Sequence, residues 1–390
     1  MSNNHSTTYL KDYKKPPFAV KALQLDFVID DDETTVTNSA QYERITEGPL
    51  LLNGESEILT LIAIHLNGTL LTPEDYELNA QTLVLSDLPD QFELTVVTKF
   101  DPKKNTKLSG LYLSGDNYCT QCESHGFRRI TYFQDRPDVM TVFTTSITAD
   151  GTRYPHMLAN GNLSEDILLS SGKRKVTWHD PSLKPCYLFA LVVGSFDLLA
   201  DRFTTRSGRE VDLHLYLEKG TIDQAHFAMA SIKQSMAWDE KAFDREYDLD
   251  IFMVVAVSDF NYGAMENKGL NIFNTKYILA SPMTATDADY IHVQGVIGHE
   301  YFHNWSGNRV TCRDWFQISL KEGLTVFRDQ SFTMDMFSSG VKRIEDANIM
   351  RTMQFNQDSG PMAHPIRPEA YMEVSNFYTV TVYNKGAEVI

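Results

Sequence analysis

The segment at residues 299–303 has the residue types and the spacing of a metal site. Its sequence, His299-Glu300-Tyr301-Phe302-His303, has the form His-Glu-x-x-His and falls in a stretch that predicts a helix. Side chains four residues apart share one face of a helix, so both imidazoles can reach one ion. Glu300 lies beside a ligand but off that face, where it can act as a general base. The pattern predicts a zinc site with His299 and His303 as ligands.

A third ligand is needed, because a catalytic zinc ion takes three ligands from the protein and leaves a fourth position to water. Glu322 follows His303 by nineteen residues, in a segment that predicts the start of a second helix. We expect Glu322 to complete the ligand set. Asp329 lies seven residues further along this predicted helix, either as the outer acceptor of a ligand imidazole or as a solvated carboxylate.

A zinc ion at this place indicates hydrolytic chemistry. The ion would lower the pKa of a bound water towards about 7 and polarise a carbonyl group, which suits attack on an amide. Glu300 is placed to take a proton from the water and to pass it to the leaving amine. The residues therefore predict hydrolysis of amide bonds, with one Zn²⁺ per chain.

Other histidines and cysteines fit a metal site less well. His292 precedes His299 by seven residues on the same predicted face, about 10 Å away along the helix axis, which is too far to share one ion. His364 lies among prolines, which favours a structural loop. Cys119 and Cys122 form a single Cys-x-x-Cys pair without a second pair, so neither a zinc ribbon nor a redox motif is predicted.

Composition narrows the class of partner. The 390 residues carry a formal net charge of −17, which disfavours binding to nucleic acid and to anionic membrane surfaces. The longest apolar run, residues 186–194, is too short for a membrane span. Residues 1–6 show no apolar stretch behind a basic start, and only four cysteines occur. We therefore expect no secretory signal and a cytoplasmic location. We also expect a monomer.

The predicted secondary structure that must position these residues differs between two parts of the chain. Before about residue 220, short segments alternate apolar and polar residues, as at residues 23–29 and 92–96, and no helical pattern interrupts them. Residues 1–195 therefore predict an antiparallel β-sandwich-like domain. Residues 196–390 mix strands at 211–217 and 251–257 with helical patterns near 225–236 and 287–305. The fold class predicted is α+β, with a boundary near residue 195.

A second motif lies upstream of the zinc ligands. Gly263-Ala264-Met265-Glu266-Asn267, followed at a fixed interval by the zinc motif, resembles the M1 (gluzincin) family of zinc aminopeptidases, and the likeness extends from about residue 110 to residue 384. The resemblance implies a thermolysin-like zinc catalytic domain after the N-terminal domain. It also implies that the family's catalytic domain continues beyond residue 390, so we expect a fragment truncated at its C-terminal end.

The resemblance also assigns roles to individual residues. Glu266 is implied to bind the free α-ammonium group of a peptide, assisted by Gln121 and Glu123 of the first domain. Tyr383 corresponds to the family's transition-state tyrosine, whose phenol donates to the oxyanion. These roles predict an exopeptidase whose substrates are peptides with a free N-terminus.

The remaining residues of this motif are implied to form the substrate track. Gly263 and Ala264 line it with backbone groups, and Met265 and Asn267 complete the binding segment. Tyr262 precedes the motif at a position where relatives often carry Met, and its stiffer ring leaves the preference for the first substrate residue open. Within this chemistry an endopeptidase and an epoxide hydrolase are alternatives, and a catalytically inactive scaffold is a third. The complete ligand set and the amine-binding residues favour the aminopeptidase.

Overall fold

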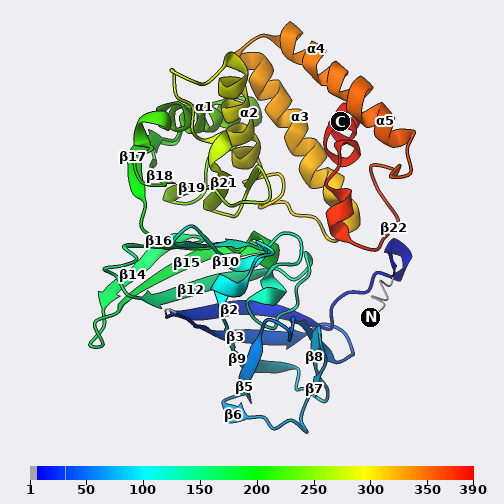
Figure 1. The fold of residues 1–390 in the computed structure, drawn as a ribbon. Helices are drawn as coiled ribbons and strands as arrows, with labels where there is room; N and C mark the ends of the chain where they lie inside the picture. The colour runs from blue at the N-terminus through cyan, green and yellow to red at the C-terminus, as the bar shows by residue number, and fades with distance from the viewer. Residues whose placement is uncertain (1–6, 31) are drawn as a thin grey trace.

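The computed structural model describes residues 7–30 and 32–390, and Figure 1 shows a strand-rich part below a helix-rich part. Apolar and polar residues alternate along the first strands, which form one eight-stranded sheet. All neighbouring strands pair antiparallel except β2 and β12, which pair parallel. The chain between these two strands is long enough for the crossover that parallel pairing requires. Its order is β14 (Asn162–Leu168), β15 (Arg174–Lys184), β12 (Thr141–Ala149), β2 (Phe18–Ile29), β3 (Thr34–Arg44), β9 (Gln91–Phe100), β5 (Thr60–Leu66) and β6 (Thr69–Leu70).

Two smaller sheets complete this part, and one of them faces the helix-rich part. That sheet has four antiparallel strands, β10 (Gly110–Ser114), β11 (Asn117–Gln121), β16 (Leu191–Gly194) and β13 (His156–Ala159). The other sheet consists of β4 (Leu50–Asn53), β8 (Thr82–Leu85) and β7 (Glu77–Leu78). Aromatic side chains pack in the core of this part: Phe27 stacks on Phe189, and Phe127 meets the Phe189 ring edge to face.

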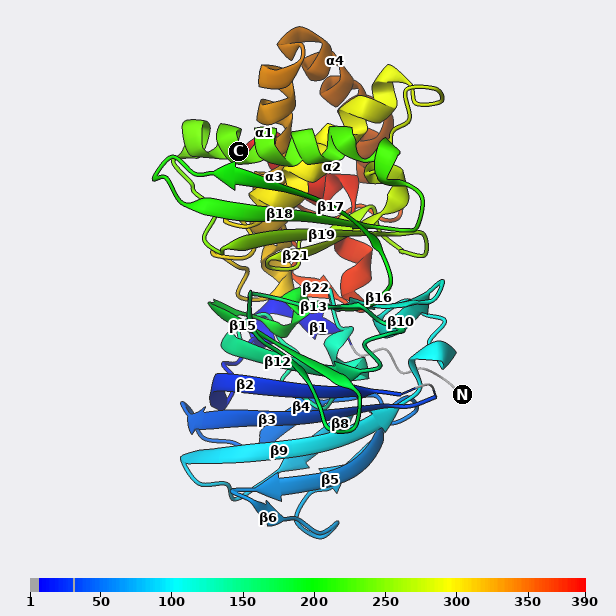
Figure 2. The same ribbon diagram turned by 90° about the vertical axis from the view of Figure 1, so that its left-hand side faces the viewer.

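The second part is built on a mixed five-stranded sheet. Its order is β17 (Asp197–Thr204), β18 (Glu210–Leu217), β19 (Ile251–Val257), β21 (Leu270–Asn274) and β20 (Ala264–Met265). Three helices cover one face of it, and Figure 2 shows α1 running alongside the strands. These helices are α1 (His226–Phe243), α2 (Asp287–Phe302) and α3 (Ile318–Met336). Helix and strand residues share one apolar core, as Ile232 and Ile297 do with Val254.

The last residues pack back against the helices. Helix α4 (Ser339–Ile349) continues through a π-helical turn at residues 350–354 into α5 (Phe355–Asp358). Strand β22 (Ala370–Tyr371) then pairs with β1 (Thr8–Tyr9), which brings the N-terminal residues of the described chain beside the helix-rich part. A second π-helical turn at residues 381–385 leads into α6 (Gly386–Val389), which packs on α3. Gly323 and Gly386 make this contact possible, because a Cβ on Gly323 would lie 2.9 Å from the Gly386 carbonyl carbon.

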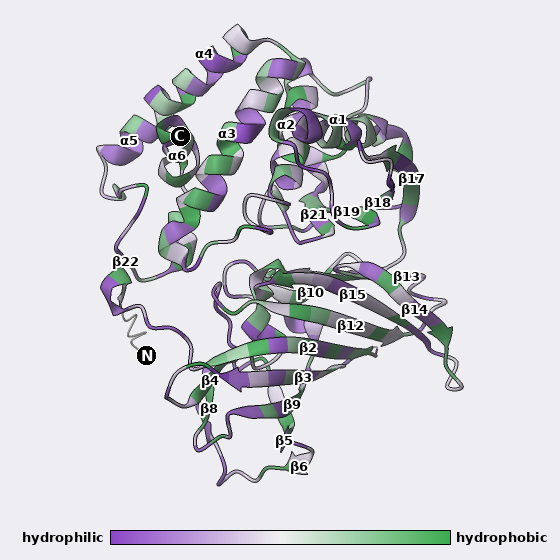
Figure 3. Cartoon of the chain, turned by 180° about the vertical axis from the view of Figure 1, so that it is seen from behind, coloured by the Kyte–Doolittle hydropathy of each residue, from purple (hydrophilic) through white to green (hydrophobic). Residues whose placement is uncertain are grey.

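The predicted α+β class is confirmed, and so is the strand at residues 251–257. The helical patterns predicted near residues 225–236 and 287–305 correspond to α1 (His226–Phe243) and α2 (Asp287–Phe302). Figure 3 shows hydrophilic and hydrophobic residues alternating along the helices. Accordingly, within residues 7–30 and 32–390, no helix is both long and apolar enough to cross a membrane. The expectation that the chain begins without a secretory signal concerns residues 1–6, which lie outside the described residues.

Candidate active site

Two adjacent helices carry the residues predicted to bind zinc. Helix α2 begins at a capping box, in which the Thr286 side chain and Asp289 bond each other's backbone N–H groups. It ends at Phe302, so His299, Glu300 and His303 come from its last turn and its C-cap. Helix α3 begins after a loop and presents Glu322 in its first turns. The two helices approach closely at Gly298, where a Cβ would lie 2.8 Å from the Phe332 ring.

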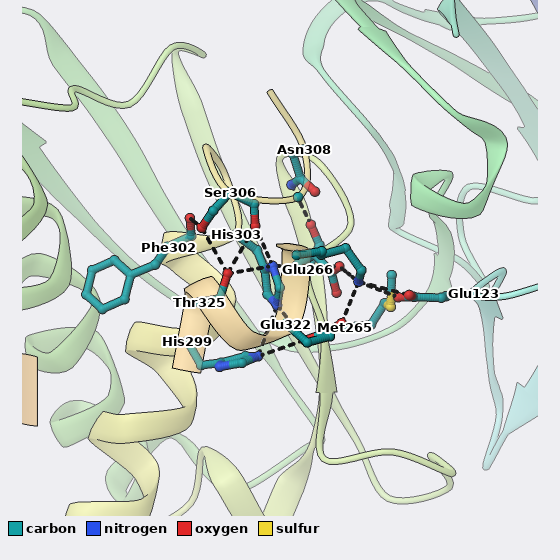
Figure 4. Close-up of polar contacts among 12 residues, drawn as sticks. Glu123, Met265, Glu266, His299, Phe302, His303, Ser306, Asn308, Glu322 and Thr325 are labelled. Atoms are coloured by element: carbon teal, nitrogen blue, oxygen red, sulfur yellow. Dashed lines mark hydrogen bonds and ion pairs between the residues drawn. The ribbon is translucent and has the colours of Figure 1, made fainter. Parts of the chain in front are cut away.

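Three side-chain atoms converge between these helices (Figure 4). His299 Nε2 lies 3.0 Å from His303 Nε2 and 3.4 Å from Glu322 Oε2, and His303 Nε2 lies 3.2 Å from the same carboxylate oxygen. A tetrahedral zinc ion with its usual bond lengths separates its ligand atoms by about 3.3 Å. The spacing of these three atoms therefore fits a zinc ion.

The other ring nitrogens fix the tautomers of both histidines. His299 Nδ1 donates to Asp329 Oδ2 at 2.6 Å, and His303 Nδ1 donates to the Ser306 carbonyl oxygen at 2.8 Å. Each Nε2 is left to offer a lone pair beside the Glu322 carboxylate, so a positive charge is required between them. Without a metal, a proton can supply it: burial lowers the pKa of His299, but its bonds to Asp329 and Glu322 raise it well above its usual range. Asp329 was predicted to be either an acceptor for a ligand imidazole or a solvated carboxylate, and the structure shows the acceptor.

A buried arginine holds the loop that carries this hydrogen bond. Arg328, on α3, donates to the Phe302 carbonyl oxygen at 2.7 Å and to Ser306 Oγ at 3.0 Å, and it also contacts Asp239. Thr325 Oγ1 lies 2.9 Å from Ser306 Oγ and 3.2 Å from His303 Nδ1. The end of α2 is therefore fixed from several sides.

Glu300 lies beside the three ligand atoms without joining them. Its side chain is buried, and Oε2 has no hydrogen-bond partner within the part of the chain that the structure describes. Burial raises the pKa of Glu300 well above its usual range; the charge of His299 lowers it, while Glu266 and Glu322 raise it further. A buried carboxylate with a free oxygen and a raised pKa is suited to accept a proton.

Next to the ligands lies a buried cluster of charges, which we call the carboxylate cluster: Glu123, Glu266, Glu322 and Lys321. Lys321 Nζ lies 2.8 Å from Glu123 Oε1 and 2.7 Å from Glu322 Oε1, and it also contacts Glu266. Burial lowers the pKa of Lys321, but the three carboxylates raise it well above its usual range. Burial raises the pKa of Glu123 to about 8, against the attraction of Lys321. The cluster thus stabilises cations.

The first domain contributes two members of the predicted amine site. Gln121 ends β11, and its Nε2 donates to the Glu123 carbonyl oxygen at 3.3 Å and to the Met265 sulfur at 3.6 Å. Its Oε1 is buried and accepts no hydrogen bond from the described residues. Glu123 accepts from the Tyr378 hydroxyl at 2.8 Å. Both side chains therefore point towards the helix-rich part of the chain.

The Gly-Ala-Met-Glu-Asn segment forms the facing wall. Ala264 and Met265 are the edge strand β20, and Asn308 Nδ2 donates to the Glu266 carbonyl oxygen at 2.8 Å. Gly263 accepts from the Asn274 backbone N–H at 2.9 Å. These bonds fix the backbone position from which the Glu266 side chain takes its place in the carboxylate cluster.

The remaining predicted residues lie at the rim and at the far wall. The Tyr383 ring stacks on His299 at 6.3 Å between centroids, and burial raises the pKa of its hydroxyl well above its usual range. Tyr262 is 38% exposed, with its ring 6.1 Å from that of Tyr378. Asn267 is fully buried behind the wall.

One cavity of about 1060 Å³ joins these parts. Every residue predicted to act lines it, apart from Asn267. The sequence did not point to Tyr378 or to Lys321, whose only signal was its place beside Glu322. His292 also lines the cavity but stands outside the group of ligand atoms, and the cysteines at 119 and 122 are buried and free.

Comparison with known proteins agrees with this site. The Peptidase M1 N-terminal domain matches residues 58–188, and the Peptidase family M1 domain matches residues 227–390. Aminopeptidase N of Escherichia coli (strain K12) is 55% identical over the whole chain, which covers 45% of that protein. Aminopeptidase N of Haemophilus influenzae is 54% identical over 98% of the chain and 44% of that protein.

A solved structure shares both the fold and part of the sequence of this chain. The crystal structure of Legionella pneumophila aminopeptidase A in complex with aspartic acid has a TM-score of 0.91 and 34% identity, over 98% of this chain and 44% of that one. The chain thus spans less than half the length of the relatives it matches. Both family domains, the identity along the chain and the shared fold lead to one conclusion: the chain belongs to peptidase family M1.

Proposed function

We propose that this chain carries the active site of a zinc-dependent aminopeptidase, which removes the N-terminal residue from peptides. The observation that supports it is the position of the carboxylate cluster, whose three carboxylates line the same cavity as the ligand atoms and adjoin them through Glu322. A peptide's charged N-terminus is a cation that such a cluster attracts. We also propose a cytoplasmic location, on composition, and separately that the protein is a monomer.

Three side chains would hold zinc: His299, His303 and Glu322. When bound there, the ion would polarise the scissile carbonyl and acidify a water molecule. Glu300 accepts the proton of the attacking water at its free oxygen and returns it to the leaving amine. Tyr383, whose hydroxyl stays protonated because its pKa is raised, donates a hydrogen bond to the carbonyl oxygen as negative charge develops there.

The amine of the substrate is held by groups from both domains. Gln121 offers its buried Oε1, an acceptor without a partner in the described chain, and Glu123 and Glu266 offer carboxylates. Lys321 keeps these carboxylates together before the substrate arrives. Since an ammonium group near Glu123 lowers the pKa of that carboxyl from about 8, substrate binding also favours its ionised form.

The test compares two peptides that differ only in N-terminal acetylation, using the complete natural protein loaded with zinc. Acetylation removes a charge-assisted contact of about 1.5–3 kcal/mol, so kcat/KM should fall at least about tenfold. Glu266→Ala should remove much of this discrimination. Glu345→Ala serves as the control, because Glu345 is an exposed carboxylate that lines the same cavity outside the carboxylate cluster. Equal cleavage of both peptides by the natural protein would refute the proposal in favour of an endopeptidase.

A further inference from the structure

One short loop connects the ligand atoms to the segment that carries Glu266. It comprises residues 303–310, which we call the ligand loop, and begins at the C-cap of α2. Backbone hydrogen bonds close it: the Asn308 N–H donates to the His303 carbonyl oxygen at 3.0 Å, and the Gly307 N–H donates to the Val310 carbonyl oxygen at 2.8 Å. Asn308 therefore has a fixed position relative to the ligand His303.

Gly307 allows the ligand loop to lie directly against the ligand ring. Its φ angle is 134°, a conformation that glycine adopts without steric cost. A Cβ at this position would lie 2.8 Å from His303 Nδ1. The Gly307 carbonyl oxygen accepts from the Tyr187 hydroxyl of the first domain at 3.3 Å. The backbone of the loop is therefore held from both sides just before Asn308.

The side chain of Asn308 extends this connection to Glu266. It is buried, and its Nδ2 donates to the Glu266 carbonyl oxygen at 2.8 Å. Glu266 lies one residue beyond the last pair of the β20 ladder, in which Met265 faces Ile272, so the sheet ends just before this carbonyl group. A buried carbonyl oxygen requires a donor, and the Asn308 amide supplies it.

The distance between Glu266 and the ligand atoms decides which bond of a peptide can be cut. Glu266 Oε1 lies 4.0 Å from His303 Nδ1, so the two groups adjoin. If Glu266 holds the amine, the first carbonyl group must reach the ligand atoms within one residue, and one residue of extended chain spans about 3.5 Å. A shift of Glu266 by part of that length would misplace the carbonyl group while leaving the ligands intact.

We propose that Asn308 is a positioning residue. Its backbone N–H bonds the ligand His303 and its side chain bonds Glu266, so it sets the distance between the metal site and the amine site. It thereby places the first peptide bond of the substrate at the ligand atoms. This inference rests on the proposed aminopeptidase function. Asn308 does not line the cavity, so it acts through Glu266 rather than by touching the substrate.

The experiment measures kcat/KM of the complete, zinc-loaded protein for alanine p-nitroanilide and for its N-acetyl derivative. Asn308→Ala removes the amide donor and volume, whereas Asn308→Leu removes the donor and keeps most of the volume. In both variants the ratio of the free to the acetylated substrate should fall at least about fivefold, because a buried carbonyl loses its partner and Glu266 shifts.

Two further measurements separate this effect from general damage to the site. Cleavage of the acetylated substrate should change less than about threefold, because that substrate lacks the charged amine that Glu266 binds. The zinc dissociation constant should stay as in the natural protein, because the backbone N–H that bonds His303 is present in both variants.

Asn38 provides the matched control. Its buried amide also donates to a backbone carbonyl oxygen, that of Tyr132 at 3.0 Å, and it lies outside the cavity lining. Asn38→Ala and Asn38→Leu should lower the Tm but leave the ratio of the two substrates unchanged.

The outcomes distinguish the inference from the function on which it rests. A ratio that both Asn308 variants leave unchanged, a fall in Asn308→Ala alone, or a loss of zinc that accounts for the fall would each overturn the inference while the aminopeptidase function stands. Equal cleavage of the two substrates by the natural protein would overturn the proposed function and the inference with it.

Discussion

The hydrogen bond between Asp329 and His299 gives the most direct test of the metal site. Asp329 Oδ2 accepts from His299 Nδ1 at 2.6 Å, and the carboxylate is partly buried. This bond selects the tautomer whose Nε2 faces the other ligands, and its charge strengthens Nε2 as a donor. Asp329→Asn keeps the size of the side chain and removes the charge. We expect the variant to fold and to bind zinc less tightly.

The size of the effect follows from the type of contact. Loss of an outer-shell partner of a histidine ligand weakens metal binding by about 10- to 100-fold, which corresponds to about 1.4–2.8 kcal/mol. The assay is the zinc dissociation constant, obtained by competition with a chelator of known affinity at neutral pH. Circular dichroism of the metal-free variant checks that the fold is retained.

Glu345→Gln is the control for this experiment, because it removes an exposed charge of the same cavity without touching a ligand. Its zinc affinity should match that of the natural protein. An Asp329→Asn variant with unchanged zinc affinity would show that the carboxylate does not support the ligand, and the reasoning from the 2.6 Å bond would fail.

Three further substitutions follow from the site. Glu300→Gln should retain zinc and lower kcat by about 10²- to 10⁴-fold, as single-turnover kinetics and metal analysis of one preparation can establish; near-normal turnover would contradict the base assignment. Lys321→Met should lower the free energy of unfolding in urea by about 3–5 kcal/mol, because it leaves buried carboxylates without their cation, whereas Lys104→Met at an exposed pair should leave it unchanged. Gly323→Ala should destabilise the protein by about 1–3 kcal/mol and lower kcat, since its Cβ would push α6 and the nearby Tyr383 away from α3; stability and kcat equal to those of the natural protein would exclude this coupling.

The parts of the structure that depend on local spacing could be predicted from the sequence. His299 and His303 share a face because of the helical period, and strands such as β2 and β19 follow from alternating or continuous apolar residues. The roles of Gln121 and Glu123 came from a family resemblance, and the structure places them at the cavity. The division at residue 195 and the roles of the site residues stay predictions.

Contacts between distant segments could not be predicted in the same way. Lys321 meets Glu123 across 198 positions of the chain, and no local pattern encodes that approach. The parallel pairing of β2 with β12 and the pairing of β1 with β22 depend on how whole sheets and chain ends pack. The helical period placed Asp329 on the same face of α3 as Glu322, but it could not predict how close α3 lies to α2. Its hydrogen bond to His299 therefore became clear only from the structure.

The carboxylate cluster has a consequence for how such a protein can change over time. Its members Glu123 and Lys321 are encoded in different domains, and their side chains meet only at the domain boundary. If the cluster binds the free N-terminus of a peptide, as proposed, selectivity for free N-termini depends on both domains together. Recombination that exchanged the N-terminal domain would leave the zinc ligands intact but would disrupt the binding of free peptide N-termini. The two domains must therefore be inherited as a pair.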